Sequence, residues 1–151
     1  MRAVIQRVRA ASVIVAEKKI SAIGPGLLIF LGILKGDGEK DLDYLLNKTV
    51  GLRIFRDKNN NMNLSVKDVS GELLVVSQFT LCANTQRGSR PSFISAEDPI
   101  KAKIMYDKYC QGLKKLSVPI EMGKFGAMMN IELVNDGPVT IILDSRLGRN
   151  K

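Results

Sequence analysis

Residues Leu27 to Leu34 form an apolar run that only Gly32 interrupts, and this run limits the possible folds most. A run of this length is typical of a β-strand that other residues cover on both faces. The turn-forming sequence Gly24-Pro25-Gly26 precedes it. Glu72 to Phe79 is a second segment of the same kind. Because no apolar run reaches about 18 residues, the sequence predicts no membrane span.

Two further segments have the apolar spacing of helices. One runs from about Lys40 to Leu52, and the other opens at Pro99 with Asp98 as its N-cap. The apolar face predicted for the second helix consists of Ile100, Ile104, Tyr109, Leu113 and Leu116. Additional strands are predicted at residues 2–9, 12–16, 20–23, 53–55, 120–122, 128–134 and 139–143. This order indicates an α+β fold with a mixed sheet in one domain, residues 1–145, followed by a basic tail at 146–151.

The composition limits the chemistry. The 151 residues include no histidine, the side chain that most often acts as a general base. Cys82 and Cys110 are expected to be structural thiols, with a nucleophilic Cys82 as the less favoured alternative. A net charge of +8 favours an anionic partner, usually nucleic acid. The first residues lack the pattern of a signal peptide, so a cytoplasmic location is the default expectation.

Ser77-Gln78-Phe79-Thr80 lies where the second buried strand meets a polar loop. Hydroxyls, an amide and free backbone N–H groups at such a position can form an oxyanion hole. Polar residues at a strand end also commonly satisfy nearby backbone groups, and from the residues alone this simpler interpretation is favoured.

Asn135 to Thr140 separates two apolar strands and includes Gly137-Pro138. An ordinary hairpin turn is the first interpretation, while a rigid Gly-Pro edge that gauges a small group is the alternative. Arg7 lies among apolar strand residues and is either solvated or a bidentate anchor for nearby carbonyls. Phe125 and Met129, near a glycine-flanked turn, are expected in the core rather than in a pocket.

Taken together, these segments resemble the D-aminoacyl-tRNA deacylase family over nearly the whole chain. The resembling blocks occur in family order at residues 2–8, 52–55, 77–81, 90–93, 125–127 and 135–140. The chain departs from the usual family residues at Cys82, Asn84, Gln86 and Met128, all outside the two central motifs.

The resemblance implies a single domain with a barrel-like sheet, and a homodimer whose active sites lie at the interface. Ser77 to Thr80 would line the pocket for the aminoacyl-adenosine end of tRNA, with Phe125 and Met129 near the adenosine. Gly137-Pro138 matches a Gly-cisPro motif that enters the partner's site and excludes L-amino acids, and Arg7 matches the arginine that steadies it. No metal or cofactor is expected.

The implied reaction is hydrolysis of D-aminoacyl-tRNA, a step of translation quality control. The ester is already activated, so a positioned water and oxyanion donors suffice and the lack of histidine is no obstacle. We expect the backbone N–H groups of Phe79 and Thr80 to hold the carbonyl oxygen while the ribose 2′-hydroxyl relays a proton. A covalent Thr80 nucleophile is less favoured. Glycyl-tRNA, including tRNA-Ala mischarged with glycine, would also be hydrolysed because glycine has no side chain to exclude.

Three rival hypotheses remain. A small-molecule esterase would use Ser77 or Thr80 and would not require RNA. A non-catalytic RNA-binding module fits the charge and the basic loop at Arg87 to Arg90, although aromatic residues make up only 5% of the chain. A related deacylase with a trans Gly-Pro would tolerate L-alanine.

Overall fold

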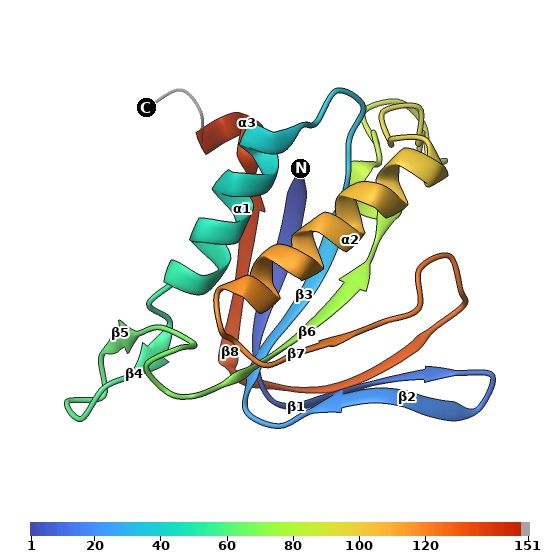
Figure 1. The fold of residues 1–151 in the computed structure, drawn as a ribbon. Helices are drawn as coiled ribbons and strands as arrows, with labels where there is room; N and C mark the ends of the chain where they lie inside the picture. The colour runs from blue at the N-terminus through green and yellow to red at the C-terminus, as the bar shows by residue number, and fades with distance from the viewer. Residues whose placement is uncertain (149–151) are drawn as a thin grey trace.

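A mixed β-sheet, curved into a nearly closed barrel, is the centre of the computed structural model, which describes residues 1–148 (Figure 1). Its strands follow the order β2-β1-β3-β6-β7, and β8 pairs with β1. Pairs involving β1 are antiparallel, whereas β3, β6 and β7 run parallel. The strands are β1 (Arg2–Val15), β2 (Lys18–Ile23), β3 (Gly26–Gly32), β6 (Glu72–Ser77), β7 (Ile120–Met122) and β8 (Asn130–Asp144). The predicted α+β class and mixed sheet are confirmed.

The two main helices, α1 (Glu39–Gly51) and α2 (Pro99–Lys115), cover one face of the sheet. Asp98 caps α2 as predicted, because its Oδ1 accepts the N–H of Ile100 at 3.0 Å. A short helix α3 (Ser145–Gly148) and a two-stranded sheet of β4 (Phe55–Arg56) and β5 (Met62–Leu64) lie at the periphery. None of the described helices is both long and apolar enough to cross a bilayer.

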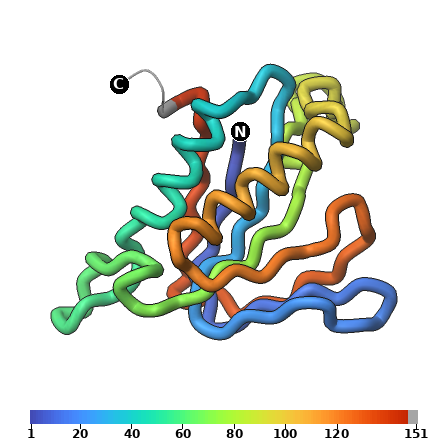
Figure 2. The backbone as a smooth tube through the Cα atoms, in the orientation of Figure 1, coloured from blue at the N-terminus to red at the C-terminus, as the bar shows by residue number. Residues whose placement is uncertain are grey.

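The first and last long strands are each continuous where the sequence predicted two. β1 pairs with β3 through its first half, with β2 through its second half, and with β8 along nearly its whole length. Both halves of β8 pair with β1, so the predicted hairpin at residues 135–140 is wrong (Figure 2). The turn-forming residues produce a bulge in a continuing strand, because β1 supplies partners on both sides of it.

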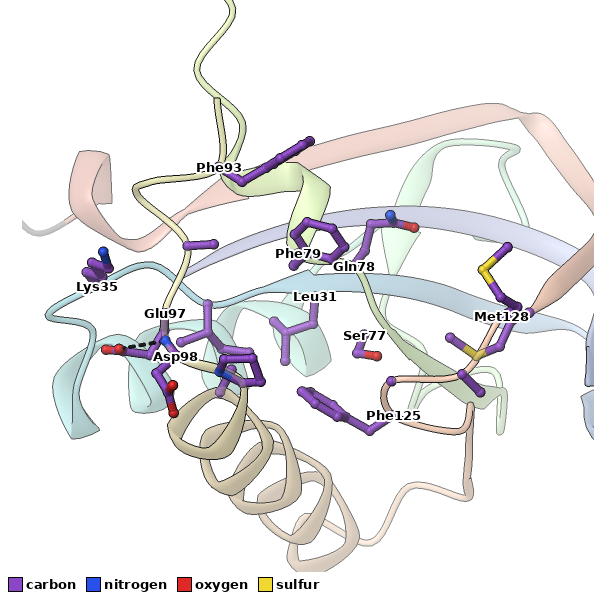
Figure 3. Close-up of a pocket in the computed structure, with 17 residues that line it drawn as sticks. Leu31, Lys35, Ser77, Gln78, Phe79, Phe93, Glu97, Asp98, Phe125 and Met128 are labelled. Atoms are coloured by element: carbon purple, nitrogen blue, oxygen red, sulfur yellow. Dashed lines mark hydrogen bonds between the residues drawn. The ribbon is translucent and has the colours of Figure 1, made fainter. Parts of the chain in front are cut away.

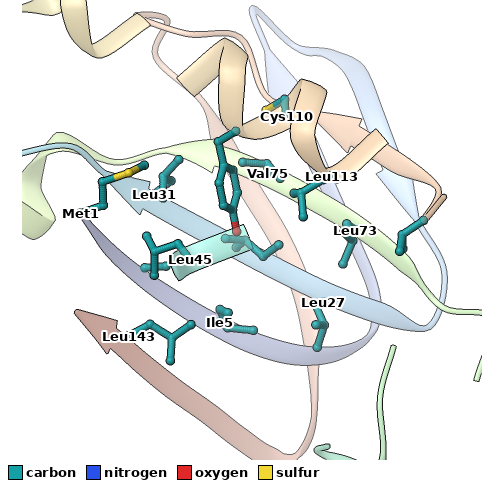
Figure 4. Close-up of a cluster of buried hydrophobic side chains, with 14 of the residues drawn as sticks. Met1, Ile5, Leu27, Leu31, Leu45, Leu73, Val75, Cys110, Leu113 and Leu143 are labelled. Carbon is teal, nitrogen blue, oxygen red and sulfur yellow. The ribbon is translucent and has the colours of Figure 1, made fainter. Parts of the chain in front are cut away.

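The core lies on both faces of the sheet, as the uninterrupted apolar runs predicted. Leu27, Ile29 and Leu31 of β3 pack under the helices with Leu73 and Val75 of β6 (Figure 4). The alternate residues Leu28, Leu74 and Val76 point to the other face of the sheet and belong to a second cluster. The second half of β1, the end of β2 and the start of β8 contribute the other residues of this cluster.

The buried face of α2 agrees with the prediction at Tyr109 and Leu113 and differs from it near the start of the helix. Ile100 and Ile104 are exposed, and the residues that contact the core are Tyr106, Tyr109, Cys110 and Leu113. Burial of the two tyrosine rings removes a large apolar surface from water, and their hydroxyls keep hydrogen-bond partners inside: Tyr106 Oη donates to the carbonyl of Val75 at 2.8 Å, and Tyr109 Oη lies 2.6 Å from Thr49 Oγ1.

The predicted basic tail begins inside α3. Arg146 Nη2 donates to the carbonyl of Lys35 at 2.6 Å and pairs with Asp37 at 3.2 Å. Arg149 and Lys151 lie outside the described residues, so the division of the chain at residue 145 stays a prediction.

Candidate functional site

An open pocket of about 780 Å³ lies where β6 ends, between the start of α2 and the loop that joins β7 to β8 (Figure 3). Its walls are mainly apolar. It is lined by Leu31, Ile33, Lys35, Ser77, Gln78, Phe79, Phe93, Ala96, Glu97, Asp98, Pro99, Ala102, Phe125, Gly126, Ala127, Met128 and Met129. A cavity of this size fits a nucleoside with a small attached group.

Ser77, Gln78 and Phe79 form one wall of the pocket, and free backbone donors lie at the end of this segment. β6 ends at Ser77, Gln78 N–H donates to the carbonyl of Leu31 at 2.8 Å, and Phe79–Cys82 forms the short 3₁₀ helix η1. The strand therefore ends two residues earlier than predicted, because the chain bends into η1. Within residues 1–148, the N–H groups of Phe79 and Thr80 have no hydrogen-bond partner. Unpaired N–H groups at a pocket wall can bind a carbonyl oxygen or an oxyanion; Phe79 lines the pocket, and Thr80 is the next residue in the chain.

Thr80 occupies a different position from its three neighbours. Ser77, Gln78 and Phe79 line the pocket, whereas the Thr80 side chain is exposed outside the lining set. Its hydroxyl oxygen accepts a hydrogen bond from Gln78 Nε2 at 2.5 Å. An amide NH₂ group donates and cannot remove a proton, so this contact does not activate the hydroxyl.

Phe125 and Met129 form the opposite wall. The ring centroid of Phe125 lies 5.6 Å from that of Tyr106, and Met129 packs partly against the second core cluster. Both residues line the pocket, so the expectation that they would be in the core rather than in a pocket is only half right. Their partial burial results from a position at the edge of the core, where Gly123 leaves room for the Met129 sulfur.

Arg7 is buried, with 2% of its surface exposed, and anchors the bulge of β8. Its Nε donates to the carbonyl of Asp136 at 3.0 Å and pairs with Oδ2 of the same residue at 3.2 Å, while Nη1 donates to the carbonyl of Ile54. The solvated alternative for Arg7 is therefore wrong, and the anchoring alternative is correct.

The bulge places Gly137-Pro138 on the surface. Residues 136–139 lie opposite the single residue Arg7, and the Gly137–Pro138 peptide bond is cis. Asn135 Oδ1 accepts the N–H of Val139 at 2.8 Å and ties the two ends of the bulge together. Gly137 and Pro138 are both exposed.

The bulge and the pocket lie far apart in one chain. Arg7 is in register with Leu27 and Leu73, whereas the pocket begins at Ser77, four residues further along β6 and three strands away from β8. At about 3.3 Å per residue and about 4.8 Å per strand, this separation is roughly 20 Å along the sheet. Gly137-Pro138 does not line the pocket of its own chain.

Neither cysteine is placed for chemistry. Cys82 is buried and donates to the carbonyl of Ile33 at 3.2 Å, and burial raises the pKa of its thiol. Burial also raises the pKa of Cys110 to about 12. Both are structural thiols, as predicted. Among residues 1–148, no three acidic or cysteine side chains cluster closely enough to hold a metal ion.

The sequence interpretation missed several lining residues, notably Lys35, Phe93 and Glu97. Phe93 could have been found from the sequence, since it ends the block at residues 90–93 that resembles the deacylase family. Lys35 and Glu97 had no such signal, because their segments meet only through long-range backbone contacts: Lys35 N–H donates to the Ser95 carbonyl and Glu97 N–H to the Ile33 carbonyl, both at 3.0 Å.

Known proteins are similar to this chain over nearly its whole length. The family model described as D-Tyr-tRNA(Tyr) deacylase matches residues 4–144. Proteins named D-aminoacyl-tRNA deacylase are 54% identical in Thermotoga petrophila, over 96% of this chain and 97% of the relative, and 51% in Aquifex aeolicus, over 97% and 99%.

Two solved structures are also similar. One, titled c-Myc DNA Unwinding Element Binding Protein, has a TM-score of 0.91 at 41% identity and covers 95% of this chain and 98% of its own. The other, a probable eukaryotic D-amino acid tRNA deacylase, has a TM-score of 0.80 at 15% identity, covers 94% and 97%, and shares the fold.

The fold and the pocket thus define the class, a single-domain α+β protein with the fold of the deacylases. The match across residues 4–144 and the identity above 50% then show the family. The chain belongs to the D-Tyr-tRNA(Tyr) deacylase family, whose members are hydrolases.

Proposed function

We propose that this protein hydrolyses the ester bond between a D-amino acid and the 3′ end of tRNA. The observation that carries the proposal is the pair of unpaired N–H groups of Phe79, which lines an apolar pocket, and of Thr80, the next residue. The names of relatives more than 50% identical support the same activity. The reaction would remove D-amino acids from tRNA before translation uses them, and we therefore propose a cytoplasmic location.

The proposed chemistry relies on position rather than on a nucleophilic side chain. The terminal adenosine lies against Phe125 and Met129, and Ser77 and Gln78 border the ester. The two amides hold the carbonyl oxygen as negative charge develops on it when water attacks. The ribose 2′-hydroxyl, adjacent to the ester, relays the proton to the leaving oxygen. No side chain with a pKa near neutrality is required, which suits a chain without histidine.

Chiral selection is proposed to come from a second copy of the chain. The separation of roughly 20 Å means that Gly137-Pro138 cannot border the pocket of its own chain, but it is exposed and anchored by Arg7. In a homodimer it would enter the partner's pocket, where its carbonyls would collide with the side chain of an L-amino acid. A D-amino acid would direct its side chain to solvent, and glycine would have nothing to exclude.

The first test is parallel hydrolysis of D-tyrosyl-tRNA, L-tyrosyl-tRNA and glycyl-tRNA-Ala at low enzyme concentration. We expect rapid loss of the D-ester, an intact L-ester, and loss of the glycyl ester at higher enzyme concentration. If all three esters stayed intact while the protein still bound tRNA, the protein would be an RNA-binding module without this activity. Turnover of simple activated esters as fast as D-tyrosyl-tRNA would indicate a general esterase. Hydrolysis of L-alanyl-tRNA would indicate the L-tolerant relative.

Thr80→Val tests the alternative of a covalent nucleophile. Valine has nearly the same size and keeps the backbone N–H but lacks the hydroxyl. Because the hydroxyl only accepts a hydrogen bond from Gln78, we expect kcat for D-tyrosyl-tRNA to fall less than about tenfold. Loss of more than about 10⁴-fold, as expected for removal of a nucleophile, would instead assign the reaction to Thr80.

A further inference from the structure

Two phenyl rings form an exposed pair on the rim of the pocket. The centroids of Phe79 and Phe93 are 5.0 Å apart at an interplanar angle of 64°, which is an edge-to-face contact. Phe79 is 60% exposed and Phe93 is 37% exposed. Figure 3 shows the pair across the cavity from Phe125. Large aromatic side chains left open to water at the edge of a pocket are well suited to stack on a flat ligand.

The segment around this pair carries positive charge. Asn84 and Ser92 form an antiparallel bridge, with N–H to carbonyl distances of 2.8 and 2.9 Å, and Phe93 follows directly. The loop that the bridge closes contains Arg87 and Arg90 and no acidic residue. In the part of the chain that the structure describes, neither guanidinium pairs with a carboxylate.

Exposed aromatic rings beside unpaired arginines are the combination that binds single-stranded nucleic acid, with bases on the rings and phosphates near the cations. Building on the proposed function, we propose that Phe93, buttressed by Phe79, stacks on the cytosine that precedes the terminal adenosine of tRNA. The adenosine occupies the cavity, and the next nucleotide crosses the rim where the phenyl pair lies. Phe93 is then a binding residue for the RNA chain and takes no part in the reaction.

The variant Phe93→Leu isolates stacking from packing, because leucine still fills apolar space against Phe79 but has no aromatic face. Ile94→Ala is the matched control, since the adjacent side chain is 78% exposed and lies outside the pocket lining. Two substrates separate the roles of the ring: D-tyrosyl-tRNA, and D-tyrosyl-adenosine, which lacks the cytidine.

We expect Phe93→Leu to lower kcat/KM for D-tyrosyl-tRNA by roughly 5- to 100-fold, mainly through KM, the range measured for losing one stacked base. Turnover of D-tyrosyl-adenosine should stay within about twofold, and Ile94→Ala should change neither substrate by more. An equal loss on both substrates would show that Phe93 only supports the pocket wall, and would overturn the proposal.

A binding measurement tests the stacking contact without depending on the hydrolysis reaction. Fluorescence anisotropy would compare a labelled acceptor-stem hairpin ending in CCA with one that is abasic at the second cytidine. We expect the abasic site to weaken binding to the wild-type protein and to have little effect on Phe93→Leu. The same penalty in both proteins would refute the stacking contact. If wild-type protein left both esters intact, the proposed function would fail, while this comparison would still decide the contact.

Discussion

Replacement of Phe79 by proline is expected to lower kcat for D-tyrosyl-tRNA by about 100- to 1,000-fold, the usual loss when one oxyanion donor is removed. Proline has no N–H, so the change deletes one of the two unpaired donors beside the pocket. Residue 79 is the first residue of η1, a position that accepts proline because the first N–H groups of a helix have no partner within it, and Gln78 before it is not helical, with φ −143° and ψ 81°.

Phe79→Ala is the control, since it removes the same exposed ring and keeps the N–H. The proline variant should therefore be far slower than the alanine variant, with KM values and melting temperatures close to each other. Single-turnover kinetics with saturating enzyme would measure the chemical step directly. Equal rates for the two variants would show that the amide of residue 79 does not stabilise the transition state.

Removal of the Arg7 guanidinium should lower the stability of the folded protein more than the other substitutions described here. Arg7→Met keeps the apolar part of the side chain but leaves the carbonyls of Ile54 and Asp136 without their donor. We expect the free energy of unfolding to fall by about 2–4 kcal/mol, because a buried acceptor loses its partner and a carboxylate loses its countercharge. For a chain of this size the melting temperature should decrease by roughly 5–15 °C.

Arg9→Ala provides the comparison, because Arg9 also pairs with Asp136, at 3.4 Å, but is 76% exposed. An ion pair in water contributes less than about 1 kcal/mol. Urea denaturation of both variants would measure the difference. If Arg7→Met were no less stable than Arg9→Ala, the buried guanidinium would not be what holds the bulge of β8 in place.

Features set by nearby residues were predictable from the sequence. The apolar runs in β3 and β6 required cover on both faces, and the structure provides it with two core clusters. Asp98 capped α2 as expected, because the geometry of an N-cap depends on only three or four residues. The polar segment after β6 was also recognised as a pocket wall through its resemblance to a known family.

Features that depend on distant partners were not predictable. Asn135 to Thr140 has the composition of a hairpin turn, but β1, almost 130 residues earlier, supplies hydrogen bonds on both sides of it. The spacing of Ile100 and Ile104 suits a buried helix face, yet α2 packs the face with Tyr106 and Tyr109 inward, where distant residues give their hydroxyls hydrogen-bond partners. Thr80 shares a motif with Ser77, but the bend into η1 turns it away from the pocket.

The pairing of β1 with β8 has a consequence for synthesis of the chain. Arg2 lies opposite Asp144 and Ile14 opposite Asn130, so one edge of β1 has no hydrogen-bond partners until β8 has been made. While the ribosome makes the intervening residues, β2 and β3 can protect the other edge, but this one stays open and can pair with strands of other nascent chains. The sheet therefore closes only after β8 has been made and has left the ribosome, and a chaperone that shields β1 until then would favour a high yield of folded protein.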